Sequence, residues 1–457
     1  MSGAALDRLR SGARESDVPF RLQMRNGRSL VCHEVLRLLP GRRLVARTEW
    51  QGGPAVLKLF LGTSAARYCA RERDGLARAG ALAREVPRVL EEIALDDMAL
   101  GLVLEYVPDS TPLAPGDGDG FGRAAGLLAR LHTGGVWQTD MNLSNLLMAH
   151  GVPWLVDGDG VRAARAPLGR GGSLDNLALL LAERPPRLDG DSDLVLARYC
   201  RARGWRIDAG SRRRLARRLT TARRHRNRRY LDKSLRDCRE FAVSLGPDGF
   251  TARRRDWNDA AWDVFLADPD GIMAAADLLK AGNSATVARW RPPAGPSLVV
   301  KRYNLKSTAH SVRRALKPRA RRAWRAANLL TLLEIPTARP LALLERRHGP
   351  LAGVSYLLME DLGDEGLLSA MAGDAPPEAI VEQVVGVFTA LKNAGLAHGD
   401  TKATNFLLAD GVVHVVDVDA VRQTTDGWRR DVARFLENFD GVLRSAWVSA
   451  FRAARLL

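Results

Sequence analysis

Short runs of apolar residues, separated by turn-forming residues, appear twice along the chain. The first three runs are separated by the sequences PGRR and QGGP, a pattern that predicts three antiparallel strands over 31–39, 44–50 and 55–60. The second three surround AGNS and PPAGP and predict the same structure over 276–280, 285–290 and 297–303. The sequence therefore predicts two similar stretches, each opening with a small antiparallel sheet.

Helical patterns follow each set of strands. Residues 66–80 and 311–333 predict helices, and Pro318 is expected to interrupt the second one near its start. Farther along each stretch, a run typical of a buried strand precedes an amphipathic helix. The strands are 98–107 and 355–362, and the helices are 121–134 and 379–395.

An internal repeat carries the most informative polar residues. Residues 135–162 and 395–422 align without a gap, and matching residues are 260 positions apart. The matching pairs are Asp140 and Asp400, Asn145 and Asn405, and Asp157 and Asp417. A strand lysine precedes each copy, Lys58 in the first and Lys301 in the second. Because each copy is much longer than a solenoid repeat, we expect a duplicated domain.

Each copy thus holds a strand lysine, an Asp-x4-Asn motif on a loop, and an aspartate at the end of a strand. Phosphoryl transfer from ATP needs these parts. The lysine holds the α- and β-phosphates, the loop aspartate orients the acceptor hydroxyl, and the asparagine and last aspartate hold Mg²⁺. One motif of this kind carries little weight, but two gap-free copies predict a kinase with ATP and Mg²⁺ as cofactors.

The sequences HGDTKATNFLL and VVDVDAVR, preceded by LVVKRY and ARPLALLE, resemble the lipopolysaccharide-core kinases, the Kdo/heptose kinase family of Gram-negative bacteria. These enzymes are distant relatives of eukaryotic protein kinases, and an Asp-x-Asp sequence in place of Asp-Phe-Gly is typical of them. The resemblance covers most of 264–440 and, more weakly, 30–180. It implies an α+β fold with two tandem protein-kinase-like domains, each with a small antiparallel-sheet N-lobe and a mostly helical C-lobe.

Domain boundaries follow from this reading. We expect a first kinase-like domain over 18–240, in which part of the catalytic loop has degraded. The GPDG sequence is typical of a turn and makes 241–262 the expected linker. The second kinase-like domain, with a short C-lobe, is expected over 263–457.

In the second half, the resemblance implies that Asp400 is the catalytic aspartate and that Lys402 contacts phosphate. It also implies that Lys301 binds the ATP phosphates, and that Asn405 and Asp417 are the Mg²⁺ ligands.

In the first half, the matching residues are Asp140 for catalysis, Lys58 for ATP, and Asn145 and Asp157 for Mg²⁺. Glu72 follows Lys58 on the predicted helix and is a candidate for the ion pair that positions that lysine. An alternative of equal weight is that Glu72 pairs with an arginine on an exposed helix face and has no role at the site.

The two halves depart from the family pattern in different ways. His398-Gly399 of the second half is replaced by Gln138-Thr139 in the first, and Lys402 is replaced by asparagine. The second half has no clear counterpart of Glu72. We expect the second half to be the catalytic one, because its loop is intact, and the first to be active or inactive with similar odds.

The spacing after the last motif aspartate argues against a protein kinase. Only 18 residues separate Asp157 from Asp175, and 14 separate Asp417 from Asp431, where the next core helices are expected to start. Little activation segment remains to dock a peptide, and no Ala-Pro-Glu sequence follows. A sugar or other small acceptor is therefore expected.

Charge narrows the choice of partners. The 457 residues include 69 Lys or Arg against 52 Asp or Glu, a formal net charge of +17, and only eight of the basic residues are lysines. Two segments without acidic residues, 212–229 and 311–325, carry ten and seven of these charges. They suit an anionic membrane surface or an acidic glycolipid, although a solvated helix face is the plain alternative. Nucleic acid is unlikely as a partner, because aromatic residues are scarce there.

Four widely spaced cysteines show no metal-binding pattern, and neither a signal peptide nor an apolar stretch of about 18 residues is visible. We therefore expect a cytoplasmic protein, held peripherally at the cytoplasmic face of the inner membrane. The expected reaction is phosphorylation of a heptose or Kdo sugar of the lipopolysaccharide inner core. Two alternatives stay open: a small-molecule kinase of the aminoglycoside or choline type, and a pseudokinase scaffold in envelope assembly.

Overall fold

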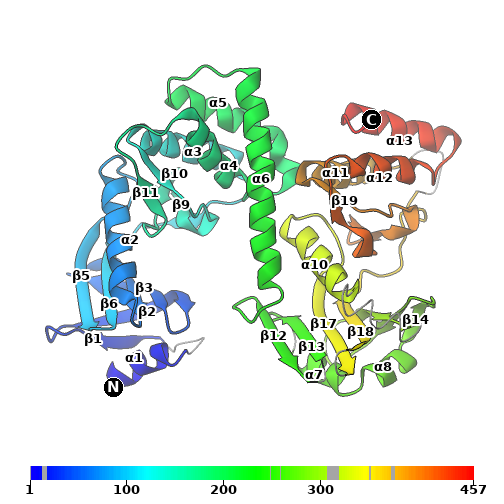
Figure 1. Cartoon of the computed structure of the whole chain (residues 1–457), viewed down its shortest axis with the longest axis horizontal. Helices are drawn as coiled ribbons and strands as arrows, with labels where there is room; N and C mark the ends of the chain where they lie inside the picture. The colour runs from blue at the N-terminus through cyan, green and yellow to red at the C-terminus, as the bar shows by residue number, and fades with distance from the viewer. Residues whose placement is uncertain are drawn as a thin grey trace. The chain divides into compact units, whose positions relative to one another are not determined.

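The computed structural model describes residues 2–12, 18–247, 249–257, 259–305, 319–348, 351–371 and 376–457. The chain divides into two compact units (Figure 1). Unit 1 consists of Met1–Arg184 and Gly190–Ala222, and unit 2 of Pro185–Asp189 and Arg223–Leu457. Each unit combines an antiparallel sheet with a mainly helical part, as expected for an α+β fold.

The sheet of unit 1 has six strands in the order β1-β2-β3-β4-β6-β5, and all neighbours are antiparallel. Helix α1 (Ser2–Arg10) contacts β1, and helix α2 (Ala65–Gly80) contacts β4, β5 and β6. The strands are β1 (Phe20–Gln23), β2 (Ser29–Leu39), β3 (Arg43–Trp50), β4 (Gly53–Leu61), β5 (Val89–Asp96) and β6 (Ala99–Glu105).

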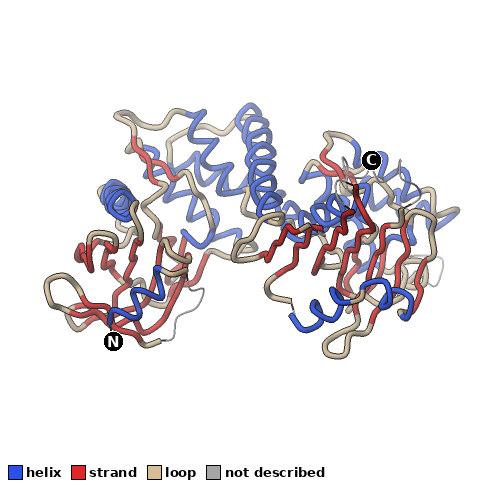
Figure 2. The backbone as a smooth tube through the Cα atoms, turned by 60° about the horizontal axis from the view of Figure 1, so that its bottom comes forward, coloured by secondary structure: helices blue, strands red, loops and turns tan. Residues whose placement is uncertain are grey.

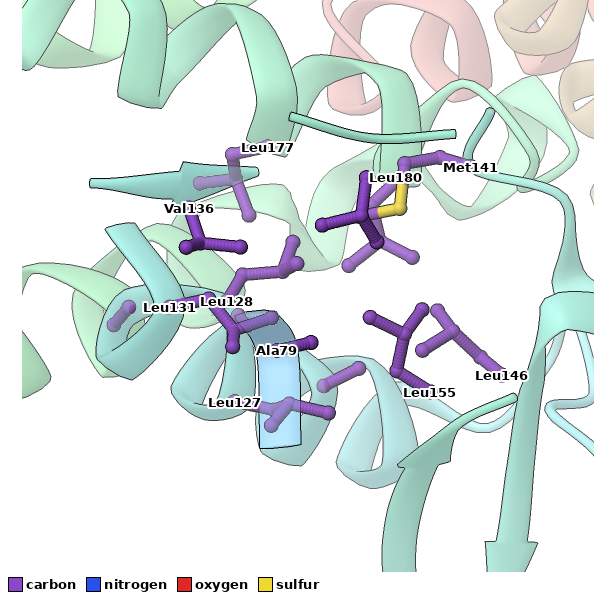
Figure 3. Close-up of a cluster of buried hydrophobic side chains, with 14 of the residues drawn as sticks. Ala79, Leu127, Leu128, Leu131, Val136, Met141, Leu146, Leu155, Leu177 and Leu180 are labelled. Atoms are coloured by element: carbon purple, nitrogen blue, oxygen red, sulfur yellow. The ribbon is translucent and has the colours of Figure 1, made fainter. Parts of the chain in front are cut away.

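The helical part of unit 1 is built around α3 (Gly118–Thr133). Asp117 caps this helix by accepting a hydrogen bond from the amide of Gly120, and the buried residues recur at helical spacing. Leu128 and Leu131 of α3 point toward Leu177 of α4 in the core (Figure 3). The other helices are α4 (Arg170–Leu181), α5 (Ser192–Ala202) and α6 (Ala209–Lys233).

Short strands place the loops of unit 1. A two-stranded sheet pairs β8 with β11, and a three-stranded sheet has the order β10-β9-β7. The antiparallel strands β9 and β10 form a hairpin that leads to Asp157. The strands are β7 (Ser110–Pro112), β8 (Val136–Gln138), β9 (Leu146–Ala149), β10 (Val152–Leu155) and β11 (Val161–Ala163).

The sheet of unit 2 has seven strands in the order β12-β13-β17-β18-β16-β15-β14, and its neighbours are also antiparallel. Helix α10 (Arg319–Leu332) contacts β17 and β18. The strands are β12 (Phe241–Gly246), β13 (Gly249–Arg254), β14 (Asp277–Lys280), β15 (Ala285–Trp290), β16 (Leu298–Tyr303), β17 (Pro340–His348) and β18 (Leu351–Glu360). Two short helices lie in this region of the sequence, α7 (Asp259–Ala267) and α8 (Pro269–Ala275).

An aromatic core holds the helical part of unit 2 together. The ring of Phe435 lies within 5.1–5.8 Å of those of Phe388, Phe406, Trp447 and Phe451. The helices are α11 (Glu378–Ala394), α12 (Gly427–Leu436) and α13 (Gly441–Ala453), and the short strands are β19 (Leu396–Ala397), β20 (Phe406–Ala409), β21 (Val412–Val415) and β22 (Arg422–Gln423). Helices and strands of both parts are distinguished in Figure 2.

The six strands predicted before the two lysines are confirmed as β2–β4 and β14–β16. The predicted linker 241–262 is wrong. Its residues form β12, β13 and the start of α7, and β13 pairs with β17 inside the sheet of unit 2. Phe241 and Phe250 are buried there, so the apolar residues of this segment serve the sheet. The division between units falls at residue 222, within α6. The expected start of the helix at 311–318, including Pro318, lies outside the described residues.

Candidate functional site

A buried ion pair forms the centre of the candidate site in unit 1. Lys58 Nζ on β4 donates to Glu72 Oε1 on α2 at 2.5 Å and to the carbonyl oxygen of Val156 at 2.7 Å. The carboxylate of Glu72 is fully buried and also accepts from the amides of Gly158 and Asp159, both at 3.0 Å. Glu72 therefore joins the strand lysine to the segment that carries Asp157.

Asp157 lies beside this pair. Its Oδ1 is 3.3 Å from Lys58 Nζ and 3.8 Å from Arg43 Nη1, and its Oδ2 accepts from Asn145 Nδ2 at 3.2 Å. Burial works to raise the pKa of Asp157, but the charges of Lys58 and Arg43 outweigh it and hold the pKa below its usual range. The carboxylate is thus kept ionised next to the asparagine.

The side chain of Gln138 connects the Asp-x4-Asn loop of unit 1 to Asp157. Its Oε1 accepts from the amide of Asp140 at 3.1 Å, and its Nε2 donates to the carbonyl oxygen of Asp157 at 2.8 Å. The side chain of Asp140 is exposed, and Asn145 donates to its carbonyl oxygen. The expected degradation of this loop therefore leaves Asp140, Asn145 and Asp157 connected.

A cavity of about 370 Å³ opens beside these groups. One part of its wall is apolar and includes Val45, Val56 and Leu147. The other part includes the polar residues Lys58 and Asp157, together with Asn145. An apolar wall that leads to a cationic and an anionic group suits a ligand with a flat base and phosphates.

Unit 2 arranges its strand lysine differently. Lys301 Nζ on β16 donates to Asp417 Oδ1 at 2.6 Å and to Asp419 Oδ1 at 2.9 Å. Asp419 also accepts from the hydroxyl of Tyr303 and from the guanidinium of Arg319. Burial works to raise the pKa of Asp417, but Lys301 lowers it overall. Among the described residues, no glutamate contacts Lys301, and Asp419 takes a comparable role.

The loop of unit 2 is held by a buried aspartate. Asp431 on α12 accepts from the amides of His398 at 2.6 Å and Gly399 at 3.0 Å. Asn405 donates to the carbonyl oxygen of Asp400 at 2.8 Å, and Lys402 Nζ is 3.4 Å from its carboxylate. Burial lowers the pKa of His398, so this histidine is neutral at pH 7 and serves to hold the loop.

The expectation that Asp175 and Asp431 start the next core helices is wrong, because they lie in the middle of α4 and of α12. Asp175 forms an ion pair with Arg218 near the surface. The neighbouring Asn176 is the buried residue that reaches the loop, donating to the carbonyl oxygen of Gln138 at 2.5 Å. His132 contacts the other end of this amide at 2.9 Å. The sequence signal that could have found Asn176 is its place among the closely spaced leucines of α4, which are buried.

Some arginines of the two predicted basic segments form ion pairs within the protein. In 319–325, three arginines form ion pairs with Asp419, Glu345 and Asp232, and 311–318 lies outside the described residues. Along α6, Arg223 is buried against Asp189. Six exposed arginines of α6 have side chains that make no hydrogen bond or ion pair with another described residue: Arg213, Arg214, Arg217, Arg224, Arg228 and Arg229.

None of the helices in the described ranges is both long and apolar enough to cross a bilayer. The same ranges contain no group of three His, Cys, Asp or Glu side chains arranged to hold a metal ion by themselves. Mg²⁺ does not require such a group, because it is usually bound by one or two protein ligands together with water and substrate phosphates.

One part of the chain resembles a known family. The sequence profile of the lipopolysaccharide kinase (Kdo/WaaP) family matches residues 296–452, which confirms the resemblance for this stretch. No curated protein matches the chain. A solved structure, WaaP in complex with acyl carrier protein, is 19% identical and covers 43% of this chain and 87% of its own, with a TM-score of 0.34.

Proposed function

We propose that the protein is an ATP- and Mg²⁺-dependent kinase that transfers the γ-phosphate to a heptose or Kdo hydroxyl of the lipopolysaccharide inner core. One observation carries this proposal: in unit 1, Lys58, Asn145 and Asp157 line one cavity. Glu72 holds Lys58 from behind this lining. The family match over 296–452 lies in unit 2, and it supplies the substrate class for unit 1 only through a common origin of the two units.

A duplication accounts for the presence of two such clusters. Five strands of unit 1 run in the order β2-β3-β4-β6-β5, and five strands of unit 2 run in the corresponding order β14-β15-β16-β18-β17. The lysines lie on the third strand of each set, β4 and β16. Equal strand order and equal lysine position support two tandem kinase-like domains with a common origin.

The residues of unit 1 divide the work of phosphoryl transfer. The apolar wall takes the base of ATP, and Lys58, held by Glu72, contacts the phosphates. Asp140 is exposed beside the cluster and orients the acceptor hydroxyl. Rate enhancement comes mainly from positioning and charge neutralisation.

The oxygen atoms of Asn145 and Asp157 fit Mg²⁺. They are hard donors on adjacent side chains, and the low pKa of Asp157 keeps one of them anionic. When bound there, Mg²⁺ supplies positive charge that offsets the charge of the phosphates. Asn145 is positioned for this role by its contact with the loop at Asp140.

Geometry favours unit 1 as the catalytic unit, whereas the sequence pattern favours unit 2. In unit 1 the lysine has a separate glutamate, so that Asp157 is not its main partner. In unit 2 both Asp417 and Asp419 are engaged by Lys301. This second arrangement supports a non-catalytic, scaffold-like role for unit 2.

The acidic core lipid is expected at the inner-membrane surface. The exposed arginines of α6 would hold the protein there, since each basic residue near an anionic surface contributes on the order of 1 kcal/mol. Vesicle binding that falls steeply with added salt is the expected behaviour.

The decisive experiment follows labelled phosphate from ATP into purified core lipid, for the full chain and for two variants, Asp140→Ala and Asp400→Ala. Loss of transfer only in Asp140→Ala is expected. Asp97→Ala, at an exposed position on unit 1, is the control and should retain full activity. Loss only in Asp400→Ala would move catalysis to unit 2, and full transfer by both variants would contradict the assignment of catalysis to these loops. Transfer to free sugars or amino alcohols instead of core lipid would indicate a small-molecule kinase.

A further inference from the structure

Arg43, the first residue of β3, is a second cation at the cavity assigned to ATP. It lines this cavity together with Lys58 and Asp157, and only 18% of its side chain is exposed. The division of work among Lys58, Asp140, Asn145 and Asp157 gives Arg43 no role. A guanidinium in this place can bind phosphate through two parallel hydrogen bonds.

The side-chain donors of Arg43 have no good acceptor within the described part of the chain. Its buried Nε has no hydrogen-bond partner there, and its Nη1 is 3.8 Å from Asp157 Oδ1, which is too far for a hydrogen bond. Lys58, in contrast, already has three acceptors, including Glu72. Because a buried donor without an acceptor is costly, Arg43 favours a ligand that supplies one.

The register of the sheet places Arg43 beside Lys58. Val45 on β3 pairs with Lys58 on β4, and Arg43, two residues earlier on the same face of the sheet, pairs with Phe60. The two cations approach one oxygen of Asp157 from adjacent strands. Lys58 Nζ is 3.3 Å from Oδ1, and Arg43 Nη1 is 3.8 Å from it. A phosphate bound next to Asp157 would therefore lie close to both cations.

The backbone that carries Arg43 is fixed before a ligand binds. In the preceding turn, Gly41 adopts a left-handed conformation with φ of 64°, and its amide donates to the carbonyl oxygen of Leu9 at 3.2 Å. The amide of Leu61 donates to the carbonyl oxygen of Arg42 at 2.8 Å. A donor on such a backbone needs little reorganisation when charge develops on a bound group, which makes its electrostatic effect strong.

Unit 2 has no arginine at the matching position. Val287 on β15 pairs with Lys301, as Val45 pairs with the lysine of unit 1, and Ala285 stands two residues earlier, at the place of Arg43. Alanine has no side-chain donor. Of the two described sheets, only that of unit 1 carries an arginine at this position, which agrees with the assignment of catalysis to unit 1.

We propose that Arg43 contacts the γ-phosphoryl group of ATP and stabilises the negative charge on its oxygens during transfer, as an arginine finger that the same unit supplies. This inference rests on the proposed kinase function and adds a catalytic residue to it. In the reaction, the acceptor oxygen forms a bond to the γ-phosphorus, and the acceptor's proton passes to the carboxylate of Asp140. The bond from the γ-phosphorus to the bridging oxygen breaks, and its electron pair leaves with ADP. Arg43 donates hydrogen bonds to the transferred group and stays protonated throughout.

The binding test compares two nucleotides that differ in the γ-phosphate. Isothermal titration calorimetry on the full chain, with Mg²⁺ present, measures the affinities for ADP and for the non-hydrolysable ATP analogue AMP-PNP. Arg43→Gln should weaken the binding of AMP-PNP about tenfold and leave that of ADP nearly unchanged, because it removes charge-assisted hydrogen bonds to the γ-phosphate alone. Arg43→Lys keeps the charge and should recover part of this loss.

Arg47→Gln is the matched control. Arg47 lies on the same face of β3, four residues after Arg43, but it is outside the lining of the cavity and pairs with Glu34. This variant should bind both nucleotides like the unchanged chain.

Transfer of labelled phosphate from ATP to purified core lipid gives a second readout. Arg43→Gln should lower kcat about 100-fold, as expected when one donor to a developing charge is removed, and leave the KM for core lipid unchanged. Glutamine keeps much of the apolar stem of Arg43, and normal ADP binding would show that the variant is folded.

The outcomes separate this inference from the proposed function. If the unchanged chain binds AMP-PNP, but Arg43→Gln weakens AMP-PNP and ADP equally or weakens neither, the contact to the γ-phosphate is refuted and the kinase proposal stands. A raised KM for core lipid with a normal kcat would also overturn the inference, because Arg43 would then bind the acceptor. If the unchanged chain does not bind AMP-PNP, the kinase function fails, and the role of Arg43 fails with it.

Discussion

Replacing Glu72 with glutamine tests whether the ion pair to Lys58 positions the nucleotide site. The change keeps the shape of the side chain and removes its charge. Lys58 would stay buried, with Asp157 at 3.3 Å as its remaining carboxylate. Breaking a buried pair in this way costs about 3–5 kcal/mol, and the remaining partner places Glu72→Gln near the lower end, about 3 kcal/mol. We also expect at least a tenfold loss of affinity for ATP, which corresponds to about 1.4 kcal/mol.

Native-state hydrogen exchange measures this cost locally, which matters because a chain with two units does not unfold in one step. Peptides from β4 and α2 should exchange faster in Glu72→Gln, while peptides from unit 2 should not change. Fluorescence titration with an ATP analogue gives the affinity. Glu92→Gln is the matched control: this glutamate pairs with Arg73 on the surface, where a pair contributes about 0–1 kcal/mol.

The reasoning would be refuted by a Glu72→Gln variant whose exchange and nucleotide affinity both equal those of Glu92→Gln. Faster exchange with normal affinity would mean that the pair stabilises unit 1 without positioning the phosphates of ATP. Only the combination of both losses supports the role that is assigned to Glu72.

Three further predictions concern groups that the fold buries. Arg223→Ala should destabilise unit 2 by about 3–5 kcal/mol in urea unfolding, because it leaves Asp189 without its bidentate partner; exposed Arg224→Ala should change stability by less than about 0.5 kcal/mol, and equal effects would contradict this. Burial lowers the pKa of His132 to about 4, so its stabilising effect is complete above the ordinary pKa of about 6.5 and is lost as pH falls toward 4, by up to about 3 kcal/mol; unfolding at pH 7 and 4.5 should show this loss, and it should shrink in His132→Gln. Gln138→Ala should slow phosphate transfer by releasing Asp157 from the loop, and Gln138→His should retain more activity; equal rates for both variants would argue against the tether.

Several elements follow directly from local patterns. The strands that carry and precede Lys58 and Lys301 are predictable, since alternating apolar runs and turn residues act over a few positions. The helices α3 and α11 also follow from periodicity, although α3 begins at Gly118, three residues before the predicted start. The place of the segment 241–262 is not predictable in this way, because a turn sequence inside a sheet looks the same as one between domains.

The candidate site could not be predicted from its motif alone. The sequence allows Glu72 either to pair with Lys58 or to pair with a surface arginine, because a helix sequence does not show which of its faces meets a strand 14 residues earlier. The replacement of the family's histidine by Gln138 predicts a degraded loop. The amide of Gln138 nevertheless holds the loop by donating to the carbonyl oxygen of Asp157. In unit 2, His398 makes the comparable contact to the carbonyl oxygen of Val416. The pairing of Lys301 with Asp419 has no local signal either, since 118 residues separate the two.

The sequence by itself determined the motif: Asp-x4-Asn and a following aspartate occur in two gap-free copies, each preceded by a strand lysine. These features depend only on residue type and short spacing, and both can be read from the sequence. The tertiary structure decided which groups meet. It brought Glu72 to Lys58, placed Asn176 rather than Asp175 against the loop, and brought Arg43 to Asp157. Such contacts depend on how helices and sheets pack over long sequence distances, and burial then fixes which charges must be paired.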